Sequence, residues 1–176
     1  MNIFKLISTP TLFALTIFSL VLITACENPA SDDEHEHIEP AGLQLKYNGE
    51  VLFEYADGTL TERKHMHLHV GEEYLFKVEL IGEHGEHIHG DQFGNDYFLD
   101  WEIENEEVLQ IHQHQEDGPW SFHVTGVAEG ESKVQLMLMH GSKDHAHPHL
   151  QTPPVEAEEA IELHIEGENG STHQHS

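Results

Sequence analysis

The stretch KHMHLHV, residues 64–70, alternates imidazole and apolar side chains without a break. Its histidines are His65, His67 and His69, and Met66 and Leu68 stand between them. Successive side chains of a β-strand point to opposite faces, so positions i, i+2 and i+4 share one face. The stretch therefore predicts a short strand with an apolar face toward a core and three imidazoles in a row on its outer face.

The same alternation recurs along most of the chain, between short runs of turn residues. Asn48-Gly49 stands between two β-prone runs, which is a strong signal for a hairpin with a two-residue turn. No segment longer than one turn has apolar residues at a helical period. These patterns predict an antiparallel β-sandwich. We expect an N-terminal hairpin and then seven strands, at residues 65–70, 73–81, 97–103, 108–114, 120–126, 132–140 and 160–166.

Three segments resemble, in order, the segments of bacterial Ig-like domains of group 2. They are HVGEEYLFKVEL (69–80), DWEIENEEVLQI (100–111) and HVTGVAEGESKVQLML (123–138). The resemblance covers about residues 65–166 and implies an antiparallel Ig-like β-sandwich of about seven strands, here with the additional N-terminal hairpin. The chain departs from the family in two long inserts, residues 82–96 and 141–159. The family is often a surface-presented module, and the resemblance implies no catalytic activity.

The first 25 residues have the features of a secretory signal. Lys5 precedes a mostly apolar stretch, 11–25, that is shorter than the roughly 20 apolar residues of a membrane-spanning helix. The end of this stretch, LITAC, resembles a bacterial lipoprotein signal with Cys26 as the lipid-accepting residue. Cys26 is the only cysteine, so no disulfide forms within the chain. The alternative is an ordinary cleaved signal that happens to contain a cysteine.

By resemblance to Gram-negative lipoproteins, we expect a lipid anchor at Cys26 and a place in the cell envelope, with the outer membrane favoured and its periplasmic or surface face left open. Residues 26–41 are acidic and poor in apolar side chains, which predicts a flexible tether. The tail, 167–176, has the same character. One β-sandwich domain is therefore expected between them, at residues 42–166.

Acidic residues dominate the charge of the chain. There are 33 of them against 7 basic residues, and the formal net charge is −26. Because phosphate binding requires a basic surface, this balance excludes nucleic acid as a partner. The negative field would attract divalent cations.

The 18 histidines are spaced in a non-random way. Eight pairs stand at i, i+2, where random placement predicts about 1.8, and none stand at i, i+1. On a strand, residues at i and i+2 lie about 6.5–7 Å apart on one face. Two such imidazoles can lean together and place their nitrogens about 2.0–2.1 Å from one zinc ion, whereas adjacent residues cannot. The spacing therefore indicates metal binding.

In an Ig-like sandwich, the loops that hold the two inserts gather at one end with the loop after residue 114. We predict that histidines from these segments and from the start of the 65–70 strand form one metal-collecting rim. Zinc is the expected ion, with copper or nickel as alternatives. His123 and His164 are instead assigned solvated or cross-strand roles, and the tail histidines weak binding. The predicted ligands are His65, His67, His69, His84, His87, His89, Asp91, His112, His114, His140, His145, His147 and His149.

The sequence thus predicts a lipid-anchored envelope protein, not an enzyme, that captures, buffers or delivers zinc, with a metal transporter or outer-membrane receptor as its partner. Binding should weaken from about pH 7.5 to about pH 5.5, because imidazole must be neutral to bind a metal. One alternative is an adhesion or envelope-interaction module with surface histidines. Another is a zinc enzyme, although the chain has no HExxH, nucleophile elbow or phosphate loop.

Overall fold

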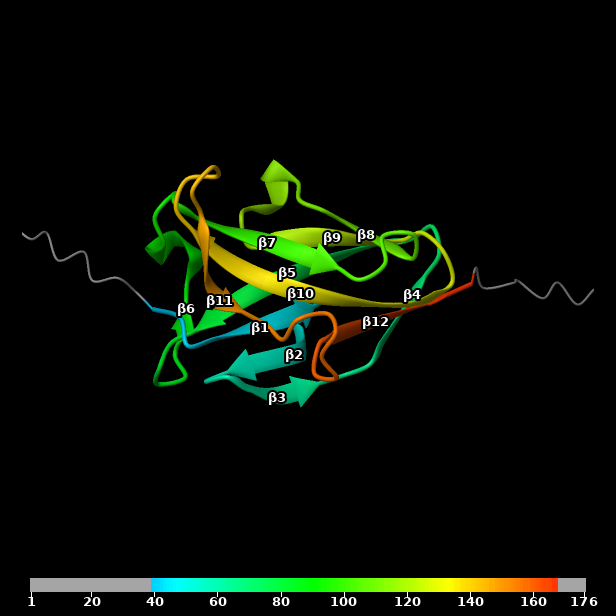
Figure 1. Ribbon diagram of the computed structural model, residues 1–176, viewed down its shortest axis with the longest axis horizontal. Coiled ribbons are helices and arrows are strands. Elements are labelled where there is room, and N and C mark those ends of the chain that lie inside the picture. Colours follow the sequence, from blue (N-terminus) through cyan, green and yellow to red (C-terminus); the bar gives the residue numbers. More distant parts are fainter. Residues whose placement is uncertain (1–38, 168–176) are drawn as a thin grey trace, which may run out of the picture. The chain divides into compact units, whose positions relative to one another are not determined.

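Two β-sheets form the fold of residues 39–167, the part of the chain that the computed structural model describes (Figure 1). The short 3-10 helices η1 (Gly90–Gln92) and η2 (Gln115–Asp117) lie in connecting loops. No helix among these residues is long and apolar enough to cross a membrane. The strands are β1 (Gly42–Tyr47), β2 (Glu50–Ala56), β3 (Thr59–Arg63), β4 (Met66–His69), β5 (Glu73–Ile81), β6 (His87–Ile88), β7 (Tyr97–Ile103), β8 (Leu109–His112), β9 (Ser121–Gly126), β10 (Gly130–His140), β11 (His147–Gln151) and β12 (Ile161–Glu166).

Sheet A has the strand order β3-β2-β1-β5-β9-β8, with β6 added to the end of β5. Sheet B is built around the long strand β10. It pairs with β7 along one edge and with β12 and then β11 along the other, and β4 pairs with β12. Every pair of strands is antiparallel except β4 with β12. The predicted all-β antiparallel sandwich is confirmed.

The core lies between the two sheets and follows the alternation of the sequence. Sheet A contributes Phe76 and Phe122, whose rings stack with centroids 5.8 Å apart. Sheet B contributes Leu68, Leu136 and Leu138, all fully buried. Because these side chains alternate with outward-facing ones, each strand presents a second, solvent-facing row on the outside of its sheet.

All seven strands expected after the hairpin are present, and two of them, β5 and β7, have the predicted bounds. The structure has more strands than predicted, twelve among the described residues. One additional strand, β3, follows a tight turn at Asp57 and Gly58, which both have positive φ. The other two, β6 and β11, lie within the two inserts, where no strand was predicted.

Strand β4 joins the two sheets at the end where β12 finishes. The Val70 N–H donates to Glu166 O at 3.0 Å, and the Gly71 N–H donates to Gly126 O of sheet A at 2.9 Å. Gly126 is suited to this junction because a Cβ there would lie 2.6 Å from the His69 carbonyl oxygen. This packing fixes the position of β4 and, with it, the outward direction of its histidines.

The outer face of sheet A carries an ion pair between β1 and β5. Lys46 Nζ lies 2.6 Å from Glu79 Oε2, and both side chains are largely buried, with exposed fractions of 17% and 27%. The hydrogen bond from Lys46, with smaller contributions from the charges of Lys46, Lys77 and His87, lowers the pKa of the Glu79 carboxyl below its ordinary value of 4.5. The contact therefore stabilises the folded state whenever the carboxyl is ionised.

Glu79→Gln is expected to lower the free energy of unfolding by about 1 kcal/mol at pH 7. Because the pKa is lower in the folded state, the contribution is complete above the ordinary value and is lost as the pH falls through the folded-state value. Urea unfolding of both proteins from pH 7 downward measures this difference, which should narrow only below pH 4.5. Glu50→Gln is the matched control, since its pair with Lys64 is exposed. A difference that persists unchanged in acid would contradict the assignment.

Candidate metal centre

Three outward-facing side chains stand side by side across sheet B. His67 on β4 is the register partner of His164 on β12, and His164 is the register partner of Glu131 on β10. They face outward because their neighbours Leu68 and Leu163 are buried in the core. The alternation seen in the sequence thus produces a row of imidazole and carboxylate groups that runs across three strands.

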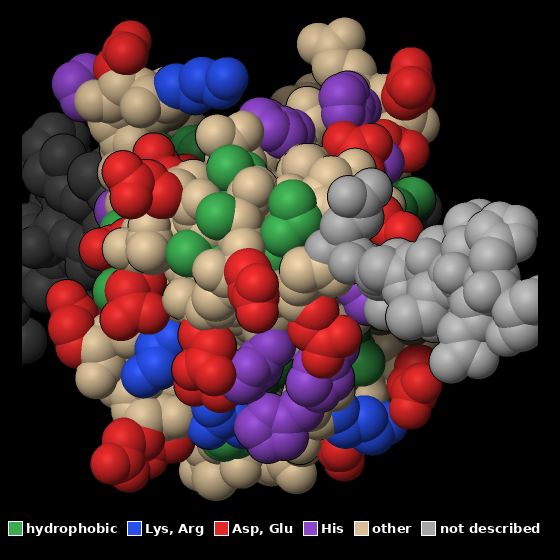
Figure 2. Space-filling view, turned by 90° about the vertical axis from the view of Figure 1, so that its right-hand side faces the viewer, with side chains coloured by type: hydrophobic (Ala, Val, Ile, Leu, Met, Phe, Trp, Pro, Cys, Tyr) green, Lys and Arg blue, Asp and Glu red, His purple; other side chains and the backbone are tan. Residues whose placement is uncertain are grey.

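His164 lies at the centre of this row, between two carboxylates. Its Nδ1 lies 3.1 Å from Glu131 Oε1, and its Nε2 lies 3.0 Å from Glu162 Oε1. The rings of His65 and His67 lie on its β4 side, with centroids 5.8 and 5.5 Å from that of His164. We call His65, Glu162 and His164 the sheet B cluster. Figure 2 shows histidine side chains gathered with acidic ones at the end of the domain where β12 finishes.

The sheet B cluster has the composition and spacing of a metal site. One ligand atom from each of its residues lies within 4.8 Å of the other two. Tetrahedral zinc with bonds of about 2.0–2.1 Å needs ligand atoms about 3.3 Å apart, so small side-chain rotations would suffice. Two imidazoles and one carboxylate suit zinc and leave a fourth position for water or an incoming ligand.

A second group of this kind lies on the outer face of sheet A. It comprises Glu73 of β5, His114 of the loop after β8, and His123 of β9, again with ligand atoms within 4.8 Å of one another. We call these residues the sheet A cluster. Among the described residues, the sheet A and sheet B clusters are the two groups of three that meet this spacing.

Other predicted ligands gather where β10 ends. The His140 ring stacks on Tyr97 at 4.3 Å, and the rings of His147 and His149 lie 5.5 and 6.0 Å from it. His140 Nε2 also lies 2.8 Å from Asp96 Oδ2. Burial, followed by the charges of Asp96 and Glu39, raises the pKa of the Tyr97 hydroxyl. The rings around His140 therefore form an aromatic stack that includes the His140–Asp96 ion pair.

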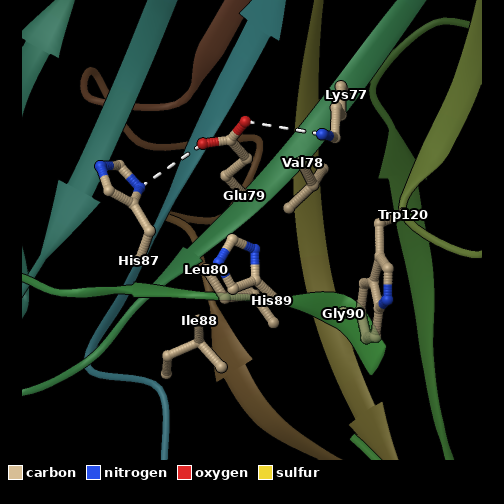
Figure 3. Close-up of a pocket in the computed structure, with 9 residues that line it drawn as sticks. All are labelled: Lys77, Val78, Glu79, Leu80, His87, Ile88, His89, Gly90 and Trp120. Atoms are coloured by element: carbon tan, nitrogen blue, oxygen red, sulfur yellow. Dashed lines mark ion pairs between the residues drawn. The ribbon is translucent and has the colours of Figure 1, made fainter. Parts of the chain in front are cut away.

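His87 and His89 lie in an open pocket of about 420 Å³ on sheet A (Figure 3). Glu79 points between His87 and Lys77 in this view, 3.4 Å from His87 Nδ1 and 3.6 Å from Lys77 Nζ. Trp120 forms the opposite wall and packs directly against Gly90. Because Lys46 and Lys77 both pair with Glu79, its carboxylate is less available to a metal in this pocket.

The predicted single rim does not form. The two inserts do lie at one end, where the Gly141 N–H donates to Asp96 O at 2.8 Å. Their histidines belong to different sheets, however, with His87 on β6 and His147 on β11. The strand at 65–70 does not join them, because β4 pairs with β12 beside residues 163–166. The predicted ligands are instead divided among both sheet faces and the end of β10.

The remaining predicted ligands belong to neither cluster or lie outside the described residues. His84 and His145 are exposed in the inserts, and His112 is exposed opposite His123. The His69 N–H donates to the Tyr74 hydroxyl at 3.0 Å. The side chain of Asp91 lies outside the described residues. So do Cys26, the proposed signal and most of the tether, and the tail after residue 167.

Sequence reasoning assigned His123 and His164 to solvated or cross-strand roles, yet each is the central residue of a cluster. For His164 there was a usable signal, since Glu162 and His164 stand at i, i+2 in IELHIE and must share a strand face. For His123 there was none, because its carboxylate neighbours, Glu73 and Asp117, reach it from another strand and from a loop.

Comparisons with known proteins add little to this geometry. No family model matches the chain, and no curated protein matches it. A crystal structure of domains 4 and 5 of the S-layer protein SbsC is similar over 58% of this chain and 47% of that one, at 14% identity and a TM-score of 0.37. The chain thus spans about half of that structure, and a likeness this weak carries no argument. The class defined here is an all-β sandwich with histidine–carboxylate clusters on both sheets.

Proposed function

We propose that this chain is a lipid-anchored metal-binding protein of the bacterial cell envelope that captures, buffers or delivers a divalent transition metal. Zinc is the first choice, with copper or nickel as alternatives. The observation that supports the proposal is the sheet B cluster, in which the imidazole that precedes β4 meets an imidazole and a carboxylate of β12. A formal net charge of −26 would favour the approach of the cation.

The surroundings of His164 suit a metal ligand. A metal-bound histidine usually donates its second ring N–H to a carboxylate, which fixes the tautomer and makes the ligating nitrogen more basic. Glu131 occupies that position on Nδ1, so Nε2 faces Glu162 and the proposed ion. The half-buried setting of His164 and Glu162, exposed by 24% and 21%, strengthens the attraction between ligand and cation.

Three protein ligands leave one coordination position open, and an open position permits exchange. A partner that offers its own imidazole or thiolate could enter there and withdraw the ion. A lipid at Cys26 and the acidic tether, 26–41, would hold the domain near such a partner at the membrane. We propose a metal transporter or an outer-membrane receptor in that role, and no enzymatic reaction.

Zinc titration of the purified protein by calorimetry at about pH 7.5 tests the proposal. We expect zinc uptake, and we expect the tightest site to weaken at least tenfold in the His65→Ala/His164→Ala variant, because two of three ligands are lost. His84→Ala/His145→Ala is the matched control, since it removes two exposed histidines from the inserts. Its affinity should equal that of the unchanged chain.

Two results would count against the proposal. Absence of zinc, copper and nickel uptake would remove metal binding and leave the adhesion or envelope-interaction module, which metal-independent binding to a protein or glycan would support. Equal losses in the two double variants would instead show that the sheet B cluster is not the specific site of the ion. Repeating the titration at about pH 5.5 should show much weaker binding, because protons compete for imidazole.

A further inference from the structure

The sheet A cluster is built in the same way as the sheet B cluster, from unrelated segments. We infer that Glu73, His114 and His123 form a second site for a divalent transition metal, and that Asp117 positions His123 within it. This inference rests on the proposed function, since it assigns a second ion to the same metal-binding protein. The contacts that support it do not involve any residue of the sheet B cluster.

His123 lies on the outer face of β9, with buried Phe122 and Val124 on either side in the sequence. Its register partner on β5 is Leu75, and Glu73 lies two residues away on the same face. Glu73 Oε2 consequently lies 3.4 Å from His123 Nδ1. The first two groups of the site are therefore fixed by the pairing of two central strands of sheet A.

The loop between β8 and β9 delivers the other two groups. It contains η2, where the Asp117 N–H donates to His114 O at 3.2 Å. Gly118 then turns the chain with a φ of 83°. The side-chain amide of Gln113 ties the loop to the sheet, since its Nε2 donates to Pro119 O at 2.8 Å and to Ser121 O at 3.1 Å. The loop is thus held in one conformation by its own hydrogen bonds.

This loop places an imidazole and a carboxylate in contact with His123. The His114 ring stands edge-on to it, with centroids 4.8 Å apart and planes at 86°. Asp117 Oδ2 lies 2.9 Å from His123 Nε2. Each nitrogen of His123 therefore faces a different carboxylate, Nδ1 toward Glu73 and Nε2 toward Asp117.

The two ring nitrogens of His123 have different neighbours, and this difference assigns a role to each. With the Nε2 proton donated to Asp117, Nδ1 keeps its lone pair and faces Glu73. The His114 ring lies close enough to complete the group. This is the carboxylate–histidine–metal arrangement that orients ligands in metal sites. His123 and Asp117 are also the least exposed members, at 17% and 24%, so solvent screens their contact less. Asp117 alone would suffice to hold a structural histidine, and it does not account for the convergence of Glu73 and His114.

The two clusters share one plan. His164 lies between Glu131 and Glu162 with His65 beside it, and His123 lies between Asp117 and Glu73 with His114 beside it. They lie in different sheets, so one ion cannot serve both. The sheet A cluster should bind more weakly, because two of its three ligands, Glu73 and His114, are exposed, whereas the sheet B cluster has one exposed ligand, His65. Solvent weakens the attraction between an exposed ligand and a cation.

Zinc titration of the full chain, with ZnCl2 as the ligand, separates the two sites. His114→Ala/His123→Ala should lose one bound ion while the tighter site keeps its affinity. His65→Ala/His164→Ala should lose the tighter ion and keep the weaker one. The His84→Ala/His145→Ala control should retain both, and urea unfolding without zinc confirms that each variant is folded.

The outcomes distinguish this inference from the proposed function. If His114→Ala/His123→Ala binds as many ions as the unchanged chain, with the same affinities, the second site is wrong and the sheet B site stands. If only His114→Ala/His123→Ala loses an ion, the second site stands without the first. If the unchanged chain binds no zinc, both fail together.

Asp117→Asn tests the positioning role. We expect the weaker zinc site to lose about 10- to 100-fold in affinity with its stoichiometry unchanged. The visible absorption of bound Co²⁺, which reports coordination geometry, should change in Asp117→Asn and recover at least in part in Asp117→Glu. An unaltered Co²⁺ spectrum and an unaltered affinity would show that Asp117 supports only the loop.

Discussion

Zinc is expected to raise the free energy of unfolding by about 2.7 kcal/mol when the free ion is at 100 times its dissociation constant for the sheet B cluster. The reason is topological. His65 precedes β4, while Glu162 and His164 belong to β12, about 100 residues later in the sequence. The unfolded chain does not hold these groups together, so binding favours the folded state. Urea unfolding with and without zinc measures the gain.

The measurement is best made in a His114→Ala/His123→Ala background, which removes the sheet A cluster. Adding His65→Ala/His164→Ala to this background should abolish most of the gain, while adding His84→Ala/His145→Ala should leave it unchanged. If zinc raised the free energy of unfolding equally in these two variants, it would stabilise the domain through other groups. A zinc-dependent loss of stability would mean that the ion binds the unfolded chain more tightly.

The strands were predictable because burial on one face leaves a strong local pattern. In β5, Phe76, Val78 and Leu80 alternate with Lys77 and Glu79, and the predicted and observed bounds agree. The same holds for β7. A period of two residues is a property of the strand itself, so it can be found without knowing which strand lies beside it.

The neighbours of each strand were not predictable in this way. Nothing in KHMHLHV indicates that β4 pairs in parallel with β12, whose first residue is Ile161. Register is set by how the inner faces pack, which is a property of the whole core. The candidate site depends on that pairing, because it brings His65 and His164 into contact. The sequence therefore predicted the kind of ligand but not the partners of each one.

The predicted rim of histidines did not form, and the surroundings of the histidines explain why. The rim was predicted because the inserts carry many histidines and the loops of an Ig-like sandwich gather at one end, yet His84 and His145 remain exposed and belong to neither cluster. The clusters instead centre on half-buried histidines held between carboxylates. Such positions resist disorder, since a ligand on an exposed loop must lose conformational entropy when it binds. A search for carboxylates two residues from a strand histidine would have found His164 but not His123.

Leu68→Ala is expected to lower the free energy of unfolding by about 2–5 kcal/mol, the range for removing a fully buried leucine side chain. Leu68 is 0% exposed and lies opposite Ile165 of β12, within the core. His67→Ala is the matched control on the neighbouring residue. Its side chain is 57% exposed, so its effect without zinc should stay within about 0.5 kcal/mol. Urea unfolding of both variants in the presence of a chelator makes the comparison.

The same substitution links the core to the site. Because Leu68 anchors β4 from the inside while His65 and His67 face outward, Leu68→Ala should loosen β4 against β12 and weaken zinc at the sheet B cluster in the folded protein. The sheet A cluster has no ligand on β4 and should keep its affinity. If zinc binding in Leu68→Ala is unchanged at both clusters, or weakened equally at both, then the position of β4 does not control the site. Comparable losses of stability in Leu68→Ala and His67→Ala would mean that the two faces of β4 are not divided between core and site.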